Sequence, residues 1–252
     1  MSALMQPASP WQTSLQTNAA AVATVSILVP IHNECHYIRA VLDRIRDAQL
    51  PAGLQKQIIL VDDGSTDGTS RIVDELTQDR AIRIHHSVLN FGKGTAIRVG
   101  LKYATGDYVI IQDGDLEYDP NDYVKLLQPL LEGRSAVVYG SRFLGNVQGM
   151  KWQNLLANRI LTCLSNILFS ANITDEATAY KAFRRDVINS IPLRCRHFEF
   201  CPEVTAKVLK RGYKIIEVPI KYKARTTAEG KKIRAWDGIQ AVWTMLKYRF
   251  VD

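Results

Sequence analysis

The 252-residue sequence lacks any apolar run of the roughly 18 residues that a membrane-spanning helix requires. The longest apolar stretch, from Ala19 to Pro30, is too short and predicts a buried strand. No basic secretory leader precedes it, and no Cys-x-x-Cys pair occurs anywhere. These absences indicate a cytoplasmic protein with reduced thiols, whose four cysteines are Cys35, Cys163, Cys195 and Cys201.

The common nucleotide-binding glycine motifs are absent as well. The Gly-rich segment from Asn90 to Gly100 has no Gly-Lys-Ser/Thr end, and Ile97 stands where the third glycine of Gly-x-Gly-x-x-Gly would fall. A P-loop NTPase and an NAD-dependent dehydrogenase with that fingerprint are therefore disfavoured. Two interpretations stay open and equal: a backbone close to a ligand, or a loop leading into a helix with Lys93 and Arg98 in solvent.

Positive charge is unevenly distributed. The chain has 32 basic and 25 acidic side chains, a net charge of +7, and residues 201–252 carry all of the surplus with 12 basic against five acidic side chains. This asymmetry indicates an anionic partner met locally, such as a phosphate or an acidic membrane surface. Nucleic acid is not an expected partner, because the clustered acids described below would repel its phosphates.

Strand-length apolar runs alternate with helix-period stretches through the first 140 residues. Residues 1–22 are rich in Gln, Ser, Ala, Thr and Pro and predict a mobile tail, and residues 23–252 one domain. The continuous apolar strands predict an α/β fold with a mostly parallel sheet and helices on both faces. The expected strands are Val25–Pro30, Gln57–Val61, Ile82–His85, Tyr108–Ile111 and Ala136–Tyr139.

After Ser141 the pattern changes to a C-terminal α/β elaboration. One long helix is predicted over Trp152–Phe169, and a strand over Tyr213–Tyr222 precedes a last helix over Trp236–Phe250. Both long helices combine apolar and basic residues. Packing in the core and contact with a membrane interface remain equally good explanations of their apolar side chains.

Polar side chains follow the predicted strands where each one ends. The segments are Pro30–Glu34, Asp62–Thr69, Gln112–Glu117 and Gly140–Arg142. Asp, Gly, Ser and Asn favour turns, which would explain a single such cluster. Three acidic clusters at successive strand ends favour an active cleft, because ligands of parallel sheets bind at the carboxyl edge.

Asp113-Gly-Asp115 is the most specific of these clusters. Two carboxylates one residue apart, in a turn after a buried strand, can both reach one small hard cation. Mg²⁺ or Mn²⁺ prefers oxygen ligands and keeps coordination positions open for substrate phosphates. The sequence therefore predicts a divalent metal at Asp113 and Asp115.

The motifs and their order resemble those of family 2 glycosyltransferases, whose GT-A fold is Rossmann-like. Within that family the chain is similar to polyprenyl-phosphate (dolichyl-phosphate) mannose and glucose synthases. The resemblance spans Val25 to Phe250. Ala179 and Tyr180 depart from the usual Gly and Phe. The matching segments are Pro30–Glu34, Asp62–Ser65, Asp113–Asp115, Gly140–Arg142, Asp175–Arg184 and Arg225–Lys231.

The resemblance implies three groups of site residues. The catalytic group consists of Asp113, Asp115, Arg225 and Lys231. In it the metal and the two basic side chains neutralise the charge of a nucleoside diphosphate leaving group. Asp175 and Glu176 lie on the acceptor side, in a C-terminal part that shapes the acceptor site from about residue 150. The donor would be bound by Pro30, His32, Glu34, Asp63, Gly114, Glu117 and Arg142, with Asp63 on the base and His32 stacked against it.

The expected activity is metal-dependent, inverting transfer of a hexose from a GDP-mannose- or UDP-glucose-type donor to a polyprenyl phosphate. A lipid phosphate is already an anion, so it needs no general base. The alternative is a glycan or other non-lipid acceptor, for which Asp175 or Glu176 would serve as base. The lipid reaction would take place at the cytosolic face of a membrane, reached by peripheral contact or through a membrane-anchored partner subunit.

Overall fold

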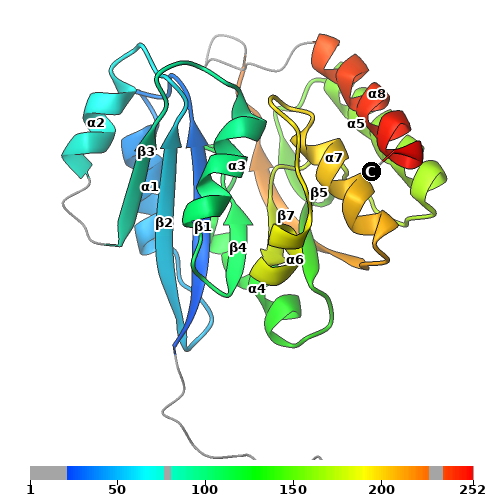
Figure 1. The fold of residues 1–252 in the computed structure, drawn as a ribbon, viewed down its shortest axis with the longest axis horizontal. Coiled ribbons are helices and arrows are strands. Elements are labelled where there is room, and N and C mark those ends of the chain that lie inside the picture. Colours follow the sequence, from blue (N-terminus) through cyan, green and yellow to red (C-terminus); the bar gives the residue numbers. More distant parts are fainter. Residues whose placement is uncertain (1–21, 77–80, 227–234, 252) are drawn as a thin grey trace, which may run out of the picture.

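The computed structural model describes residues 22–76, 81–226 and 235–251. Its core is a seven-stranded sheet in the order β3-β2-β1-β4-β6-β5-β7 (Figure 1). The strands are β1 (Ala23–Ile31), β2 (Leu54–Asp62), β3 (Ile82–His86), β4 (Tyr108–Ile111), β5 (Val137–Gln148), β6 (Lys181–Arg184) and β7 (Ile215–Lys223).

The sheet is mostly parallel, as predicted. Strands β1 to β4 pair in parallel with one another, and β5 pairs in parallel with β7. Only β6 is antiparallel, inserted between β4 and β5. Strand β6 was not predicted from the sequence, because its four residues follow a polar segment and carry too short an apolar pattern.

Helices cover both faces of the sheet and form two separate cores. One core packs α1 (Ile38–Asp47), α2 (Thr69–Leu76) and α4 (Tyr123–Leu131) against one face. The other packs α3 (Lys93–Tyr103), α6 (Arg185–Ser190) and α7 (Phe200–Lys210) against the opposite face. Strand β4 illustrates the alternation, since Ile110 enters the first core while Val109 and Ile111 enter the second.

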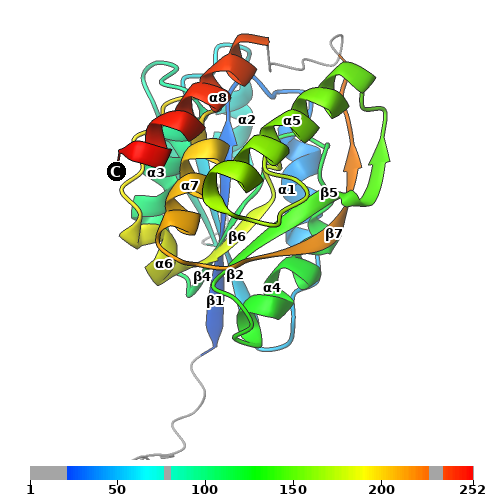
Figure 2. The same cartoon turned by 90° about the vertical axis from the view of Figure 1, so that its right-hand side faces the viewer.

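Two long helices, α5 (Trp152–Phe169) and α8 (Ala235–Phe250), lie side by side outside α7 (Figures 1 and 2). The fully buried residues of α5 are polar, Thr162 and Ser165, whereas its large apolar side chains are mostly exposed. Within the described ranges, none of the helices combines the length and apolar character needed to cross a membrane.

The prediction that Gly140-Ser-Arg142 follows the end of a strand was wrong, because β5 runs through these residues to Gln148 and places them inside the sheet. The predicted mobile tail, residues 1–22, lies outside the described residues apart from Val22.

Candidate functional site

A cleft of about 1060 Å³ opens at the carboxyl ends of β1 and β4. Its far wall comes from one face of α5 and from Asp237, Gly238 and Ala241 of α8. The strand-end prediction placed the site at this edge, and most of the predicted site residues do line one cavity. They are Pro30, His32, Glu34, Asp63, Asp113, Gly114, Asp115, Glu117, Arg142, Glu176 and Arg225.

The Asp113-Gly-Asp115 turn begins where β4 ends and is held by buried hydrogen bonds. A Cβ on Gly114 would lie 2.5 Å from the Ile31 side chain, so only glycine fits there. The residue before the turn, Gln112, accepts hydrogen bonds from the hydroxyls of Tyr123 (2.8 Å) and Tyr180 (2.6 Å). Gln112 was not predicted as a site residue. One sequence signal could have pointed to it, because Tyr180 stands where the resembling family usually has Phe and so adds a hydroxyl group.

Arg225 connects three acidic side chains of the cleft. Its guanidinium donates to Glu34 at 3.0 Å and to Asp115 at 2.5 Å, and its backbone N–H donates to Glu117 at 2.6 Å. Glu117 also accepts a 2.9 Å hydrogen bond from the Tyr222 hydroxyl. The segment after β7 therefore brings Arg225 to the strand-end acids. Lys231, the other residue predicted to bind phosphate, lies outside the described residues.

The carboxylates of this edge repel one another. Burial, together with the negative charges of Asp113 and Glu117, raises the pKa of Asp115 to about 7 against the opposing charge of Arg225. Crowded carboxylate oxygens are the donor set that Mg²⁺ and Mn²⁺ prefer, so the residues present fit such a cation. Among the described residues no group of three or more His, Cys, Asp or Glu side chains is arranged to hold a metal.

The Gly-rich segment, from Asn90 to Gly100, lies against the cleft. Its lysine, Lys93, contacts one of the carboxylates at the strand ends. Lys93, the first residue of α3, forms an ion pair with Asp113, and neither side chain is more than about a fifth exposed. The segment does lead into a helix and Arg98 is exposed, as one of the two interpretations stated, but its placement of Lys93 in solvent is wrong. Asp63, expected to contact the nucleotide base, accepts hydrogen bonds from the backbone N–H groups of Phe91 (2.9 Å) and Gly92 (2.6 Å). These hydrogen bonds fix the start of α3.

Arg142 and Asp175 form an ion pair with each other. They were expected to contact different substrates, Arg142 the donor and Asp175 the acceptor. Arg142 Nε and Nη2 each lie 2.7 Å from an oxygen of Asp175, and both side chains are buried. The guanidinium also lies 5.1 Å from the ring centre of Tyr222. Asp175 therefore stands behind Arg142, with both of its carboxylate oxygens engaged.

Glu176 has a different environment. Its side chain is fully buried in the cleft wall, and neither of its carboxylate oxygens has a hydrogen-bond partner. Burial raises its pKa to about 7; the Lys181 ammonium lowers it and Asp175 raises it. An unpartnered buried carboxylate is costly, which makes Glu176 a candidate for a functional role.

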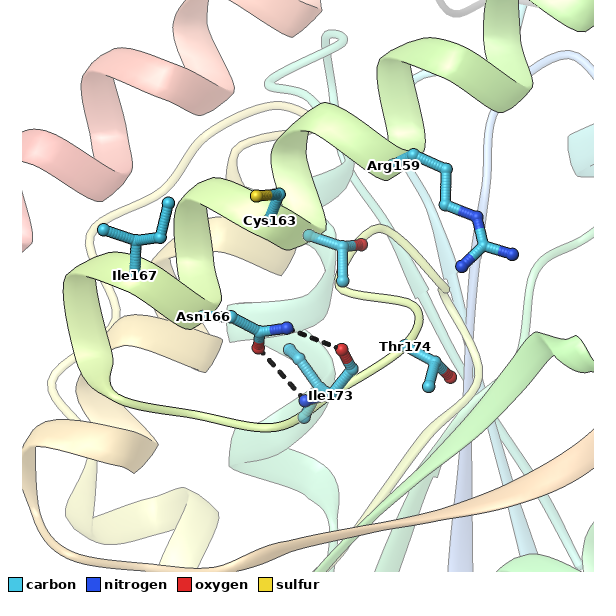
Figure 3. A pocket seen from close by; sticks show the side chains of 7 residues that line it. Arg159, Cys163, Asn166, Ile167, Ile173 and Thr174 are labelled. Atoms are coloured by element: carbon cyan, nitrogen blue, oxygen red, sulfur yellow. Dashed lines mark hydrogen bonds between the residues drawn. The ribbon is translucent and has the colours of Figure 1, made fainter.

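A second, smaller hollow of about 480 Å³ lies on the other side of α5 (Figure 3). Its floor is the turn after the helix, which Asn166 fixes through hydrogen bonds of 2.8 and 3.0 Å to the backbone of Ile173. Arg159 is its only charged lining residue, and its guanidinium lies 4.5 Å from the Phe143 ring centre. No acid of the strand ends reaches this hollow, so it is separate from the cleft.

The chain belongs to glycosyl transferase family 2. The family model, described as "Glycosyl transferase family 2", matches residues 26–191, which include most of β1, all of β2 to β6 and the whole Asp113-Gly-Asp115 turn. The protein is therefore a glycosyltransferase, and its sheet and helices have the GT-A fold.

Several known proteins are similar to this chain. A polyprenol monophosphomannose synthase of Mycolicibacterium smegmatis is 28% identical over 81% of the chain and 79% of its own length. A dolichol-phosphate mannosyltransferase of Pyrococcus furiosus is 27% identical over 82% of the chain, which spans only 58% of that relative. Among solved structures, the glucosyl-3-phosphoglycerate synthase of Mycobacterium tuberculosis with Mn²⁺, UDP-glucose and phosphoglyceric acid matches with a TM-score of 0.70 at 21% identity, covering 91% of this chain and 81% of that one.

Proposed function

We propose that this glycosyltransferase moves a hexose from a GDP-mannose- or UDP-glucose-type donor to a polyprenyl phosphate, with inversion, at the cytosolic face of a membrane. The names of the two relatives, a polyprenol monophosphomannose synthase and a dolichol-phosphate mannosyltransferase, support a lipid phosphate as the acceptor class. The phosphate oxygen attacks the anomeric carbon, and the nucleoside diphosphate leaves.

One structural observation carries this proposal: the two helices that wall the cleft expose large apolar side chains on their outward faces. Toward the cleft, α5 presents Gln153, Asn154 and Asn158 together with Ala157 and Leu161, and α8 presents Asp237, Gly238 and Ala241. The outward side chains of the same two helices are exposed and apolar, which water-soluble surfaces rarely show in such number. They are Trp152, Leu155, Leu156, Ile160 and Ile167 on α5, and Trp236, Ile239, Trp243, Leu246 and Phe250 on α8.

We call these ten residues the outer apolar surface. Basic side chains accompany it, with Lys151 and Arg159 on or beside α5 and Lys247 and Arg249 on α8. Aromatic and aliphatic side chains flanked by bases suit the headgroup region of an anionic bilayer. A lipid anchored in that bilayer would then meet the cleft between the two helices that contact the membrane.

A divalent cation, Mg²⁺ or Mn²⁺, is part of the proposal. Asp113 and Asp115 would hold it, and it would supply charge neutralisation to the leaving diphosphate. Arg225 stands where it can bind the same phosphates. Pro30, His32, Glu34, Asp63, Gly114, Glu117 and Arg142 remain the proposed donor-binding group. The Mn²⁺ and UDP-glucose named for the M. tuberculosis enzyme support a metal and a nucleotide-sugar.

The direct experiment mixes the protein with Mn²⁺ or Mg²⁺, a panel of labelled nucleotide-sugars and a short polyprenyl phosphate. A labelled, organic-extractable glycolipid with inverted anomeric configuration is expected for at least one donor. The same lipid without its phosphate is the control acceptor and should stay unlabelled. Absence of glycolipid with every donor would refute the proposed acceptor.

Membrane contact is tested separately by sedimentation with vesicles containing about 30% anionic lipid. Trp236→Glu with Trp243→Glu should reduce the bound fraction at least about tenfold, because two interfacial aromatics become charges. Val124→Glu is the matched control, since Val124 is an exposed apolar residue of α4, away from this surface. Equal binding of all three proteins would contradict the assignment of the outer apolar surface.

A second candidate is transfer to a hydroxyl of a glycan or small molecule, and Glu176 favours it. A hydroxyl acceptor needs a base, and a carboxyl with a pKa of about 7 is well matched to that task. Asp175, the other acceptor-side residue, has both oxygens on Arg142. Lipid-free transfer to sugars or phosphoglyceric acid that Glu176→Gln abolishes would select this candidate.

A further inference from the structure

Each carboxylate of Asp113-Gly-Asp115 is already paired with a basic side chain of the protein. Lys93 from the start of α3 contacts Asp113, and Arg225 from the segment after β7 contacts Asp115 at 2.5 Å. The two bases come from distant parts of the sequence and face opposite members of the motif. All four side chains line the cleft, and each is less than a fifth exposed.

This arrangement opposes the entry of a metal by itself. A cation that displaced these side chains from the motif would leave the Lys93 ammonium without Asp113 and the Arg225 guanidinium with Glu34 alone, which is unfavourable for partly buried charges. A diphosphate removes that cost, because its oxygens can accept both basic side chains while its charge attracts the metal. Four carboxylates, those of Glu34, Asp113, Asp115 and Glu117, surround these two basic side chains, so this part of the cleft retains an attraction for a divalent ion.

We propose that Lys93 and Arg225 act as a cation lock on the metal motif, so that a divalent metal and a nucleoside diphosphate bind together and each binds poorly alone. Lys93 thereby becomes a third diphosphate-binding residue: on donor binding it passes from Asp113 to the phosphates. This inference rests on the proposed nucleotide-sugar donor and metal, and it is independent of the acceptor.

The contact of Lys93 with Asp113 is fixed by its backbone. Gly94 and Thr95 donate their N–H groups to the carbonyls of His197 and Arg196, both at 3.0 Å. Gly92, with φ of 94°, passes so close to His197 that a Cβ there would lie 2.2 Å from the ring. The first turn of α3 therefore has a set position, and only the flexible lysine stem needs to move when its partner changes.

The test is Mn²⁺ binding to the nucleotide-free protein, followed by electron paramagnetic resonance. Lys93→Met should raise the Mn²⁺ affinity about threefold to tenfold, as expected for loss of one competing, partly exposed ion pair. GDP or UDP should raise the Mn²⁺ affinity of the wild type, and this coupling should shrink in Lys93→Met. By reciprocity, Mn²⁺ should improve diphosphate binding by the same smaller factor.

Lys125→Met is the matched control, because Lys125 of α4 pairs with Asp122, the residue just before that helix, and neither residue lines the cleft. It should change neither Mn²⁺ affinity nor coupling. Lys93→Arg keeps the charge and should keep the coupling, and circular dichroism establishes that each variant is folded. Unchanged or weaker nucleotide-free Mn²⁺ binding in folded Lys93→Met would overturn the lock. A negative glycolipid assay beside intact coupling would instead reject only the acceptor.

Discussion

Replacing Lys207 by methionine should strongly destabilise the protein. Lys207 and Glu203, one turn apart on α7, form an ion pair of 2.5 Å with 1% and 0% of their side chains exposed. Lys207 also donates to the Pro192 carbonyl at 2.7 Å and lies 4.1 Å from the Tyr248 ring centre. Losing the lysine leaves the Glu203 carboxylate buried without its counter-charge.

The expected cost is about 3–5 kcal/mol, the range for removing one partner of a buried pair. For a chain of this size that lowers the melting temperature by roughly 6 to 20 °C. Glu203 also accepts the N–H groups of Arg194 (2.8 Å) and Cys195 (2.6 Å). Arg196 and His197, which follow Cys195, accept hydrogen bonds from the start of α3. Loss of Lys207 should therefore loosen the loop around these residues before the sheet unfolds.

The assay is urea unfolding followed by circular dichroism, with Lys210→Met as control because Lys210 is an exposed lysine of the same helix. That control should stay within about 0.5 kcal/mol of the wild type. The double variant Glu203→Gln with Lys207→Met should cost at least about 1 kcal/mol less than the two single losses added together. A single Lys207→Met loss below about 1 kcal/mol, or strict additivity, would refute the reasoning.

Three further outcomes are expected. His86 places its two ring nitrogens 3.0 and 2.9 Å from Asp62 and Asp74. Burial lowers the pKa of His86, but these two contacts outweigh burial and raise that pKa above its ordinary value. The stabilisation of the folded protein by His86 is therefore complete below about pH 6.5 and is lost as pH rises through the folded-state pKa. Melting temperatures from pH 6 to 8 should therefore fall less in His86→Gln than in the wild type. Asp115→Ala should abolish metal-dependent turnover in the glycolipid assay and leave the melting temperature nearly unchanged, since this carboxyl is already held at an unfavourable pKa of about 7. Tyr180→Phe should cost about 1 kcal/mol in urea unfolding, the value of one buried hydrogen bond, and equal stability would show that its 2.6 Å contact contributes nothing.

Much of the fold could be predicted from local patterns. Apolar runs such as Gln57–Val61 and Tyr108–Ile111 fall inside β2 and β4, and the 3.6-residue period of Ile38, Val41, Leu42 and Ile45 is the buried face of α1. These signals are visible because each residue's burial repeats at the period of its own element. Strand β6 and the length of β5 were missed, since pairing across the sheet, and not a local pattern, determines both.

The site was partly predictable for a similar reason. Parallel strands end at one edge of a sheet, so the sequence alone could predict that Glu34, Asp113 and Asp115 lie close together. The ion pairs between segments that are distant in the sequence could not be predicted. Nothing near Lys93 in the sequence indicates Asp113, and nothing near Arg142 indicates Asp175.

The sequence by itself determined the family, the alternation of strands and helices, and the acids that collect at one sheet edge. Those depend on residue type and spacing along the chain. Only the tertiary structure decided which positive charge pairs with which negative one, because ion pairs join residues up to 191 positions apart, as between Glu34 and Arg225. It also decided that α5 turns its polar face to the cleft and its apolar face outward, since the sequence gives a helix two faces and only its packing neighbours select the one that is buried.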